Sequence, residues 1–421
     1  MAEQQKADDQ AHGARSLIWR SAPFRAYLGS TAFSGMAFAM QYLLISWLLI
    51  GVLLLPADQV GVLQALMGAP GIFIMLWGGA SADRTDPRGL LIRVYALAPL
   101  LPLLLLVVDG AGHLNVWTVA VWGLGMSVVS SFSAPAQQAI LNRVSGAAVQ
   151  QGVSAATAVG FLVQITGLAV AGQMETVGLG TVLIVQAACL AIGALAVRRI
   201  AAVATPPNPN PTSALRTITA GLKATLVHKV IFHLLTINFI SSIFNAGAFM
   251  TVFPYIIARV YQGDAILLAI MMAVFYAGAT FANILMFRFM PFARPGRLFL
   301  IMQLSRIVVL YLLWIEPGWW LLILATLGWG VNMGYTTTLA RTIVQESAAP
   351  EYRGRILSVF TLGMMGSAPI GAIALGVVIE IFGTLNALLP AMVVSLLLFC
   401  YGAFTPVWGY RSPAQSSSPG G

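Results

Sequence analysis

The sequence is poor in charged residues and in cysteine. Only 8% of its 421 residues are Asp, Glu, Lys or Arg, whereas an ordinary soluble domain has about 25%. So few charges cannot cover a soluble protein of this length, which excludes a soluble globular enzyme and a disordered chain. The two cysteines, Cys189 and Cys400, lie in apolar runs and indicate neither a disulfide framework nor a metal site.

Long apolar runs, in contrast, are abundant. Hydrophobic residues make up 59% of the sequence, in stretches of about 20 residues that suffice to cross roughly 30 Å of hydrocarbon. These stretches are too long and unbroken for β-barrel strands. The sequence therefore predicts an all-α polytopic membrane protein. Its twelve expected transmembrane helices lie near 26–50, 60–82, 89–108, 115–140, 150–174, 178–197, 230–257, 264–287, 297–315, 319–343, 355–379 and 385–408.

Positive charge is sorted between the two sides of this expected membrane protein. The chain has 22 Lys and Arg against 13 Asp and Glu, a net charge of +9. With a cytoplasmic N-terminus, every Lys and Arg except Arg259 and Arg306 falls on the cytoplasmic side or at a helix end there. Because cytoplasmic loops collect Lys and Arg, we expect a multi-pass protein of the cell (inner) membrane with both termini cytoplasmic. The basic excess is explained without a nucleic-acid partner.

The longest polar break divides the spans into six and six. Its Pro-rich beginning is typical of an extended linker, and its second part places Leu215, Ile218, Leu222 and Leu226 on one helical face. That face indicates either an interfacial helix or a solvated linker helix. The expected parts are a cytoplasmic N-terminal tail at 1–25, a six-helix bundle at 26–197, a cytoplasmic linker at 198–229, a second six-helix bundle at 230–408 and a disordered tail at 409–421.

The two halves show a faint internal repeat. Trp122-Gly123 in the first half corresponds to Trp329-Gly330 in the second, and Ala37-Phe38 corresponds to Ala248-Phe249. Repeated halves around a central pathway are typical of secondary transporters. The sequence thus predicts two six-helix pseudo-repeats.

The most informative polar segment follows the second expected span. Residues 78–91 have the sequence GGASADRTDPRGLL, in which small residues allow close helix approach. The carboxylate of Asp83 and several basic residues then occupy a short turn. Asp83 is placed to cap a neighbouring helix and pair with an arginine. The alternative is a simple cytoplasmic hairpin.

This segment resembles the loop between the second and third helices of the major facilitator superfamily. Ser81 and Asp86 depart from the usual Leu and Gly of that signature. The residues that match it are Gly79, Asp83, Arg84 and Arg88. Further segments resemble the branch of multidrug and macrolide efflux proteins and the enterobactin exporter, namely Phe24-Arg25, residues 134–141 and residues 353–358.

The resemblance implies the major facilitator fold and transport by alternating access. In it, Asp83 would hold the beginning of the eleventh span in the outward-open state, as a conformational latch. The candidate partners of Asp83 are Arg143, Arg353 and Arg355. Leu168 stands where antiporters of this superfamily often have proline, which leaves import of a siderophore or similar solute as the alternative to export.

No Asp or Glu lies well inside any expected span. Proton-driven pumps usually carry the proton on a buried carboxylate or histidine. The remaining candidates are Asp83, the rim acids Asp58, Asp109 and Glu380, and His233 near the inner end of the seventh span. His233 could titrate near neutrality, although a lone histidine at a helix end is more often only a satisfied side chain. Protons are therefore the candidate coupling ion, with substrate charge and membrane potential as the alternative.

The most unusual residue is Arg306 in the ninth span. Counted from Arg297, it lies about 13 Å into the membrane, where a charge costs at least about 2.5–3.5 kcal/mol. We expect it either to bind an anionic substrate or to bond structurally to carbonyls or Gln303. Polar residues in spans that line the cavity in the family are further candidates. The candidate substrate-binding residues are Arg306, Gln41, Gln164, Asn245, Asn332 and Tyr335.

Motifs for other chemistry are absent from the sequence. No phosphate-binding loop of an ATP-driven pump, no Cys/His cluster with metal spacing and no Ser/His/acid triad is found. We therefore expect a transporter and no enzyme, with no cofactor and no metal, acting as a monomer in the lipid bilayer. The favoured function is efflux of a small amphipathic, and with Arg306 in the site anionic, molecule such as a siderophore, secondary metabolite or drug.

Overall fold

A computed structural model describes residues 21–82, 86–145, 149–201, 214–290, 292–349 and 351–412. Within these ranges the chain is helical and contains no β-strand. Eleven of the described helices are long and apolar enough to cross a membrane. The all-α polytopic architecture predicted from the apolar runs is confirmed.

The tenth expected span, near 319–343, coincides with helix α15 (Trp319–Ser347). At 1.5 Å per residue α15 is about 43 Å long, more than a bilayer core requires, yet it is not among the eleven. Buried polar residues, including Asn332 and Thr336, lie along it. These polar side chains reduce the apolar content of α15, and they face the protein interior.

The described residues form two compact units, which do not coincide with the two halves of the sequence. The first takes in the described residues of Met1–Ile45 and Trp77–Pro211, and the second those of Ser46–Leu76 and Thr212–Gly421. The end of the first span and most of the second therefore group with the C-terminal helices.

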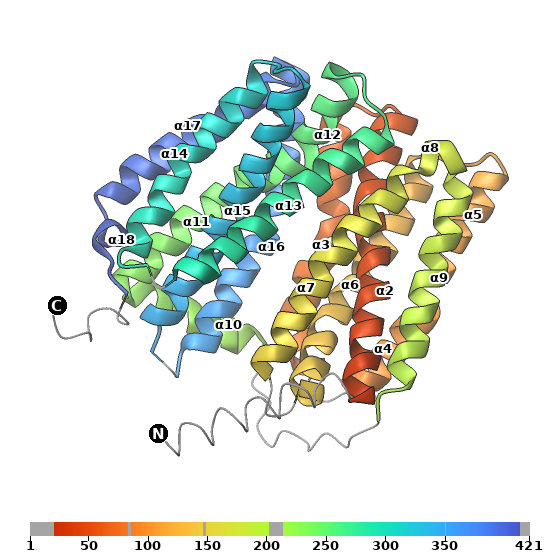
Figure 1. The fold of residues 1–421 in the computed structure, drawn as a ribbon, viewed down its shortest axis with the longest axis horizontal. Helices are drawn as coiled ribbons and strands as arrows, with labels where there is room; N and C mark the ends of the chain where they lie inside the picture. Colours follow the sequence, from red (N-terminus) through yellow and green to blue (C-terminus); the bar gives the residue numbers. More distant parts are fainter. Residues whose placement is uncertain are drawn as a thin grey trace. The chain divides into compact units, whose positions relative to one another are not determined.

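The first unit contains most of α2 and six further helices (Figure 1). Within it, α4 packs against α6 and α9, and α5 packs against α9. The helices are α2 (Ala22–Trp47), α4 (Pro87–Leu97), α5 (Leu100–Gly110), α6 (Val116–Ser145), α7 (Val149–Gly172), α8 (Met174–Val177) and α9 (Leu179–Arg198).

The second unit contains the remaining helices, with α13 packed against α15 and α14 against α17 (Figure 1). Its long helices are α3 (Ala57–Ala82, as far as Leu76), α10 (Ala214–Val227), α11 (Lys229–Gly247), α13 (Ala265–Phe289), α14 (Pro295–Trp314), α15, α16 (Arg353–Phe382) and α17 (Leu389–Ala403). Its short elements are the π-helical turns η1 (Leu48–Val52), η3 (Ala248–Val252) and η4 (Ile256–Val260), the 3-10 turn η5 (Asn386–Leu388), and α12 (Phe253–Tyr255) and α18 (Pro406–Gly409).

Local sequence explains several helix ends. The carboxylate of Asp264 accepts the backbone N–H of Leu267 at 2.8 Å and so caps the beginning of α13. Gly383 follows α16 with φ +87°, a conformation that favours glycine and terminates the helix.

The linker between the sequence halves ends in α10. The side chains of Leu222 and Leu226 are exposed, whereas Gly221 and Thr225 are buried. Gly221 lies so close to the backbone of Arg355 in α16 that a larger residue would meet it. An exposed apolar face opposite a buried small-residue face is compatible with a helix at the membrane interface.

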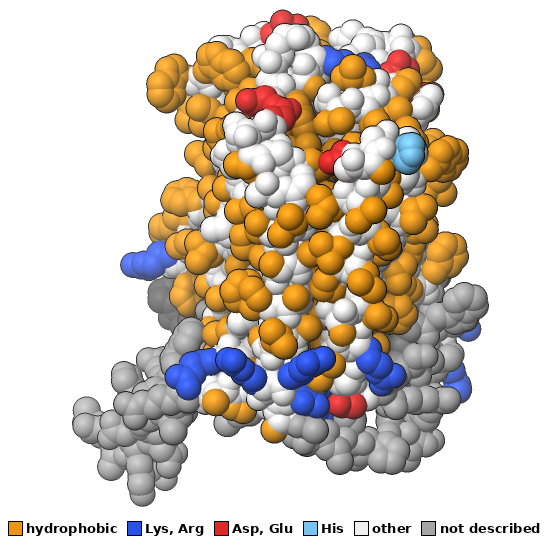
Figure 2. Space-filling model, turned by 90° about the vertical axis from the view of Figure 1, so that its right-hand side faces the viewer, with side chains coloured by type: hydrophobic (Ala, Val, Ile, Leu, Met, Phe, Trp, Pro, Cys, Tyr) orange, Lys and Arg blue, Asp and Glu red, His pale blue; other side chains and the backbone are white. Residues whose placement is uncertain are grey.

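The surface agrees with a membrane environment. On the face in Figure 2, hydrophobic atoms cover the middle, most Lys and Arg side chains lie near one end, and most Asp and Glu lie near the other. Large apolar side chains such as Phe287, Trp320 and Phe404 are at least 84% exposed. An apolar belt between two polar ends is the pattern that a lipid bilayer selects.

Candidate functional site

Arg306 lies in the middle of an apolar helix. Because α14 begins at Pro295, Arg306 is about 16 Å from the beginning of the helix and about 12 Å from its end. Its exposed fraction is 3%. The residue is therefore deeper along the helix than a start at Arg297 implies, and it faces the protein interior, as the sequence predicts.

The guanidinium of Arg306 joins three helices by hydrogen bonds. Its Nε donates to Oδ1 of Asn332 in α15 at 3.2 Å, and its Nη1 donates to Oε1 of Gln303 at 3.2 Å. Nη1 also donates to Oγ of Ser241 in α11. The Ser241 hydroxyl in turn donates to Gln303 at 3.1 Å. These four residues, Ser241, Gln303, Arg306 and Asn332, form what we call the Arg306 network.

Asn332 is also held by α14. Its Nδ2 donates to the carbonyl oxygen of Met302 at 2.6 Å and to Oγ of Ser305 at 2.7 Å. The asparagine thereby presents its Oδ1 to Arg306. This arrangement makes Asn332 a positioning side chain for the guanidinium.

No carboxylate balances the charge of Arg306 among the residues that the structure describes. Its hydrogen-bond partners are neutral oxygens, and its Nη2 makes no hydrogen bond within the described part of the chain. Nε2 of Gln303 is likewise buried without a described partner. The Arg306 network therefore holds an uncompensated positive charge. Such a charge is costly to bury in free energy.

The other expected substrate-binding residues have hydrogen-bond partners or surroundings of their own. Gln41 accepts a hydrogen bond from Gln186 at 3.2 Å, in the first unit. Asn245 accepts the indole N–H of Trp329 at 2.8 Å. Gln164 is half-buried on α7, and Tyr335 packs against apolar residues of the second unit. Of the six, Arg306 and Asn332 are joined by a hydrogen bond in the described part of the second unit.

An aromatic cluster surrounds Trp329. This fully buried ring meets Phe249, Phe253 and Phe275 edge-on, with ring centroids 5.6–5.7 Å apart. The sequence marks Trp329 only through the internal repeat and does not indicate this cluster, because its members come from four separate elements. Their edge-to-face packing stabilises the second unit.

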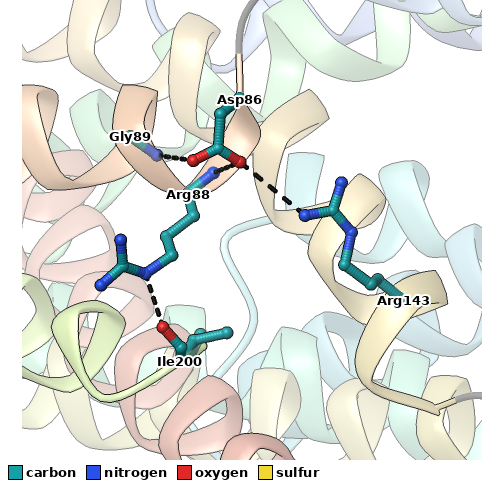
Figure 3. Close-up of polar contacts among 5 residues, drawn as sticks. All are labelled: Asp86, Arg88, Gly89, Arg143 and Ile200. Carbon is teal, nitrogen blue, oxygen red and sulfur yellow. Dashed lines mark hydrogen bonds and ion pairs between the residues drawn. The ribbon is translucent and has the colours of Figure 1, made fainter. Parts of the chain in front are cut away.

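The loop after the second span is described only from Asp86 onward; Asp83, Arg84 and the surroundings of Gly79 lie outside the described structure. Asp86 caps α4, because its carboxylate accepts the N–H groups of Arg88 at 3.3 Å and Gly89 at 3.0 Å (Figure 3). Nη1 of Arg143 in α6 lies 3.7 Å from Oδ1 of Asp86. The capping and arginine pairing that sequence suggests for Asp83 are both made here by Asp86.

The remaining arginines of the expected latch have separate roles. Arg88 donates from Nε to the carbonyl oxygen of Ile200 at 2.5 Å and from Nη2 to that of Arg198 at 3.0 Å (Figure 3). It therefore caps the C-terminal end of α9. Arg353 and Arg355 are exposed at the beginning of α16, and neither pairs with a carboxylate in the described part of the chain.

His233 has a nearby partner. Its Nδ1 lies 2.6 Å from the hydroxyl oxygen of Tyr401 in α17. This bond satisfies the imidazole in the way expected of a structural histidine. Proton coupling through His233 stays a prediction.

Two aromatic hydroxyls lie near the rim that carries Arg259. Tyr255 donates its hydroxyl to the carbonyl oxygen of Leu55 at 2.6 Å, and Tyr261 donates to that of Pro317 at 2.7 Å. Burial, and to a smaller extent the negative charge of Glu316, raise the pKa of Tyr261 to about 12. Tyr261 therefore remains a hydrogen-bond donor at physiological pH.

This protein combines apolar membrane-spanning helices with a buried polar network. That combination is typical of the polytopic membrane proteins to which solute transporters belong. The sequence profile of the transmembrane secretion effectors, a family of the major facilitator superfamily, matches residues 19–418. The chain belongs to this family. Family and fold together indicate a transporter rather than an enzyme.

Solved structures support the same fold. The chain is similar to the nucleoside transporter NupG, with a TM-score of 0.72 and 14% identity over 92% of this chain and 100% of that one. It is similar to a bacterial homologue of the human lysosomal transporter Spinster (TM-score 0.67, 14% identity, 91% and 96% covered). It is also similar to a POT family transporter in complex with a thioalcohol conjugated peptide (0.64, 11%, 90% and 94%). A search of curated protein sequences finds no match. The predicted major facilitator fold is confirmed; the efflux branch is not.

Proposed function

We propose that this secondary transporter exports a small amphipathic, anionic organic molecule by alternating access. Its membership of the transmembrane secretion effector family supports the outward direction. The lack of a phosphate-binding loop in the sequence supports coupling to an ion gradient or the membrane potential rather than to ATP. Siderophores, secondary metabolites and acidic drugs have the required chemistry.

The observation that carries the cargo class is the uncompensated charge of Arg306. A guanidinium held by Asn332, Gln303 and Ser241 is pre-oriented, and it attracts a carboxylate or catecholate over a neutral or cationic molecule. The competing interpretation is structural, since the same bonds connect α11, α14 and α15.

The latch and the coupling residue are further parts of the proposal. Asp83 would hold the transporter outward-open through Arg143, Arg353 or Arg355, as the family resemblance implies. His233 would be the proton carrier if protons drive the cycle, and the exposed polar contact with Tyr401 supports access of water to it.

Import on the same fold is the second candidate. Leu168 occupies the position where the resemblance expects the proline of antiporters, and it is fully buried in α7. A leucine keeps the backbone N–H that proline lacks. This departure from the antiporter pattern favours the uptake of a siderophore-like solute.

An untargeted comparison of medium and cell extract tests the direction of transport. The strains are a deletion mutant, its complement with the wild-type chain, and the same complement carrying Arg306→Met. Export predicts a compound that the deletion strain loses from the medium and retains in cells. A compound left in the medium and missing from cells would overturn export and support uptake.

A further inference from the structure

A groove lies between the beginning of α2 and the end of α9, both in the first unit. Its volume is about 440 Å³, and it is lined by Arg25, Gly29, Phe33, Ile192, Ala196 and Arg199, among others. None of these residues belongs to the Arg306 network or to the loop that follows the second span. The groove thus consists of residues to which no part of the proposed transport mechanism has been assigned, although Arg88 of the expected latch bonds to the carbonyls of Arg198 and Ile200 on either side of Arg199.

The mouth of the groove is cationic. Arg25 and Arg199 are both exposed, and neither forms an ion pair with any residue that the structure describes. No acidic residue lines the groove. Lys and Arg side chains gather near one end of the face in Figure 2, with hydrophobic atoms above them. Two unpaired guanidinium groups at the edge of an apolar belt attract an anion.

The walls of the groove are apolar and continue into the membrane. Phe33 is eight residues from Arg25 along α2, about 12 Å at 1.5 Å per residue, and Ile192 is about 10 Å from Arg199 along α9. Phe33, Ile192 and Leu195 are 37%, 41% and 55% exposed. The groove thus passes from a charged mouth to exposed hydrocarbon-like walls over a distance that corresponds to part of an acyl chain.

Small residues form the floor. A Cβ atom built on Gly29 would lie 4.0 Å from Cβ of Ala196, so the two helices are in contact with no large side chain between them. This leaves space above the floor for a chain of methylene groups. A larger residue at either position would fill the groove.

We propose that this groove binds an anionic phospholipid from the adjoining leaflet. The phosphate lies between Arg25 and Arg199, and one acyl chain lies along Phe33 and Ile192. Basic pockets between transmembrane helices on the cytoplasmic side suit anionic head groups, and arginine pairs with phosphate in a bidentate geometry. The apolar walls distinguish a lipid from a free phosphate ion, which has nothing to place against them. The proposal rests on the membrane-spanning fold and is independent of cargo and direction.

Native mass spectrometry of the full-length protein, released from detergent with added phosphatidylglycerol or phosphatidylcholine, tests the site. We expect the wild type to retain phosphatidylglycerol in preference. The double variant Arg25→Gln with Arg199→Gln should bind it about 30-fold more weakly, from the loss of two arginine contacts at the surface. Arg93→Gln is the matched control, because Arg93 is an exposed arginine of the same unit outside the groove. This variant should bind like the wild type.

A second variant tests the acyl-chain part without changing charge. Gly29→Leu should fill the groove and reduce retention of long-chain phosphatidylglycerol, with both arginines in place. It also keeps the proposal testable if the double arginine variant fails to fold. Equal retention of the two lipids by the wild type, or equal binding by Gly29→Leu and the wild type, would overturn the proposal. The first of these results would point to another occupant, such as the residues that precede Ala22.

Discussion

Glu380, near the end of α16, accepts the backbone N–H of Ala57, the first residue of α3, at 2.7 Å. The same Oε1 lies 3.5 Å from Nη1 of Arg259. One carboxylate thus caps a helix and pairs with the arginine that the charge distribution marked as an exception. Arg259 also stacks over Tyr255 at 4.4 Å. The exception to the positive-inside pattern is therefore explained by a local partner, and this rim contact connects the second, seventh and eleventh spans.

Removing this carboxylate should loosen the rim. We expect Glu380→Ala to lower the free energy of unfolding by about 1–2 kcal/mol, because both the helix cap and the ion pair are lost. Glu380→Gln keeps an acceptor for Ala57 and should cost less than about 1 kcal/mol, since the pair with Arg259 is half-exposed. Thermal unfolding of the purified variants measures both. Equal losses would show that the charge, and not the cap, is what matters.

Asp86 should matter to α4 mainly as a cap. Asp86→Ala is expected to cost about 1 kcal/mol of stability, whereas Asp86→Asn retains an acceptor for the N–H groups of Arg88 and Gly89 and should cost only a few tenths. Arg143→Gln removes the charge that pairs with Asp86, and its effect should stay below about 1 kcal/mol. Unfolding curves for the three variants separate capping from charge pairing. A larger loss from Arg143→Gln than from Asp86→Ala would contradict this assignment.

The latch is tested by turnover rather than stability. If Asp83 stabilises one transport state, Asp83→Asn should slow turnover several-fold while substrate binding stays nearly unchanged. Asp86→Asn is the matched control, since it removes a carboxylate three residues away. Transport rates and binding affinities in proteoliposomes measure the two effects. Slow turnover in Asp86→Asn alone would assign the latch to Asp86, and normal rates in both variants would remove the latch from this loop.

Arg306 should distinguish cargo by charge. Arg306→Met preserves much of the side-chain volume but removes the charge, and should weaken transport of an anionic cargo by about 10- to 100-fold, as for loss of a charged hydrogen bond. Arg306→Lys keeps the charge and should retain more activity, although it cannot make all the bonds to Asn332 and Ser241. Competition between anionic and neutral analogues in vesicles is the measurement. Equal loss for both analogues would favour the structural interpretation.

Close packing of α11 and α16 depends on Gly247 and Gly371, which lie against each other's backbone. A Cβ on Gly371 would meet the carbonyl oxygen of Ile243 and lie 2.9 Å from the backbone nitrogen of Gly247, so Gly371→Ala should destabilise the protein by about 1–3 kcal/mol. Gly366 lies in the same helix with nothing within 4 Å of its Cβ position. Gly366→Ala is therefore the matched control and should be neutral or stabilising by up to about 1 kcal/mol. Thermal unfolding in detergent should show a lower unfolding temperature for Gly371→Ala and an unchanged or higher one for Gly366→Ala. Similar losses in both variants would refute the packing argument.

The sequence alone could identify the helices, the superfamily resemblance and the depth of Arg306. Each of these follows from a local or periodic property: the length of an apolar run, the spacing of a loop motif and the count of residues from a helix start. Even so, α15, which the sequence predicts as a span, is not among the eleven helices that are long and apolar enough to cross a membrane. It contains polar residues, such as Asn332 and Thr336, that are buried in the protein.

The partners of the polar residues could not be deduced in this way. Nothing near Ser241 in the sequence marks it as a partner of Arg306, and nothing near Ala57 indicates that Glu380 caps its helix. The first contact joins residues that are 65 positions apart in the sequence, and the second joins residues that are 323 positions apart. They therefore depend on how helices pack and not on local pattern.

The amino-acid sequence by itself determined that this chain crosses the membrane many times, because burying apolar runs of that length requires lipid. It also placed one arginine at the centre of an apolar span. Only the tertiary structure decided that neutral oxygens surround Arg306 and that Asp86 caps α4. The physical reason is that the drive to bury apolar surface depends on the types of consecutive residues, which the sequence gives directly. Hydrogen-bond partners depend instead on which side chains meet when the helices pack.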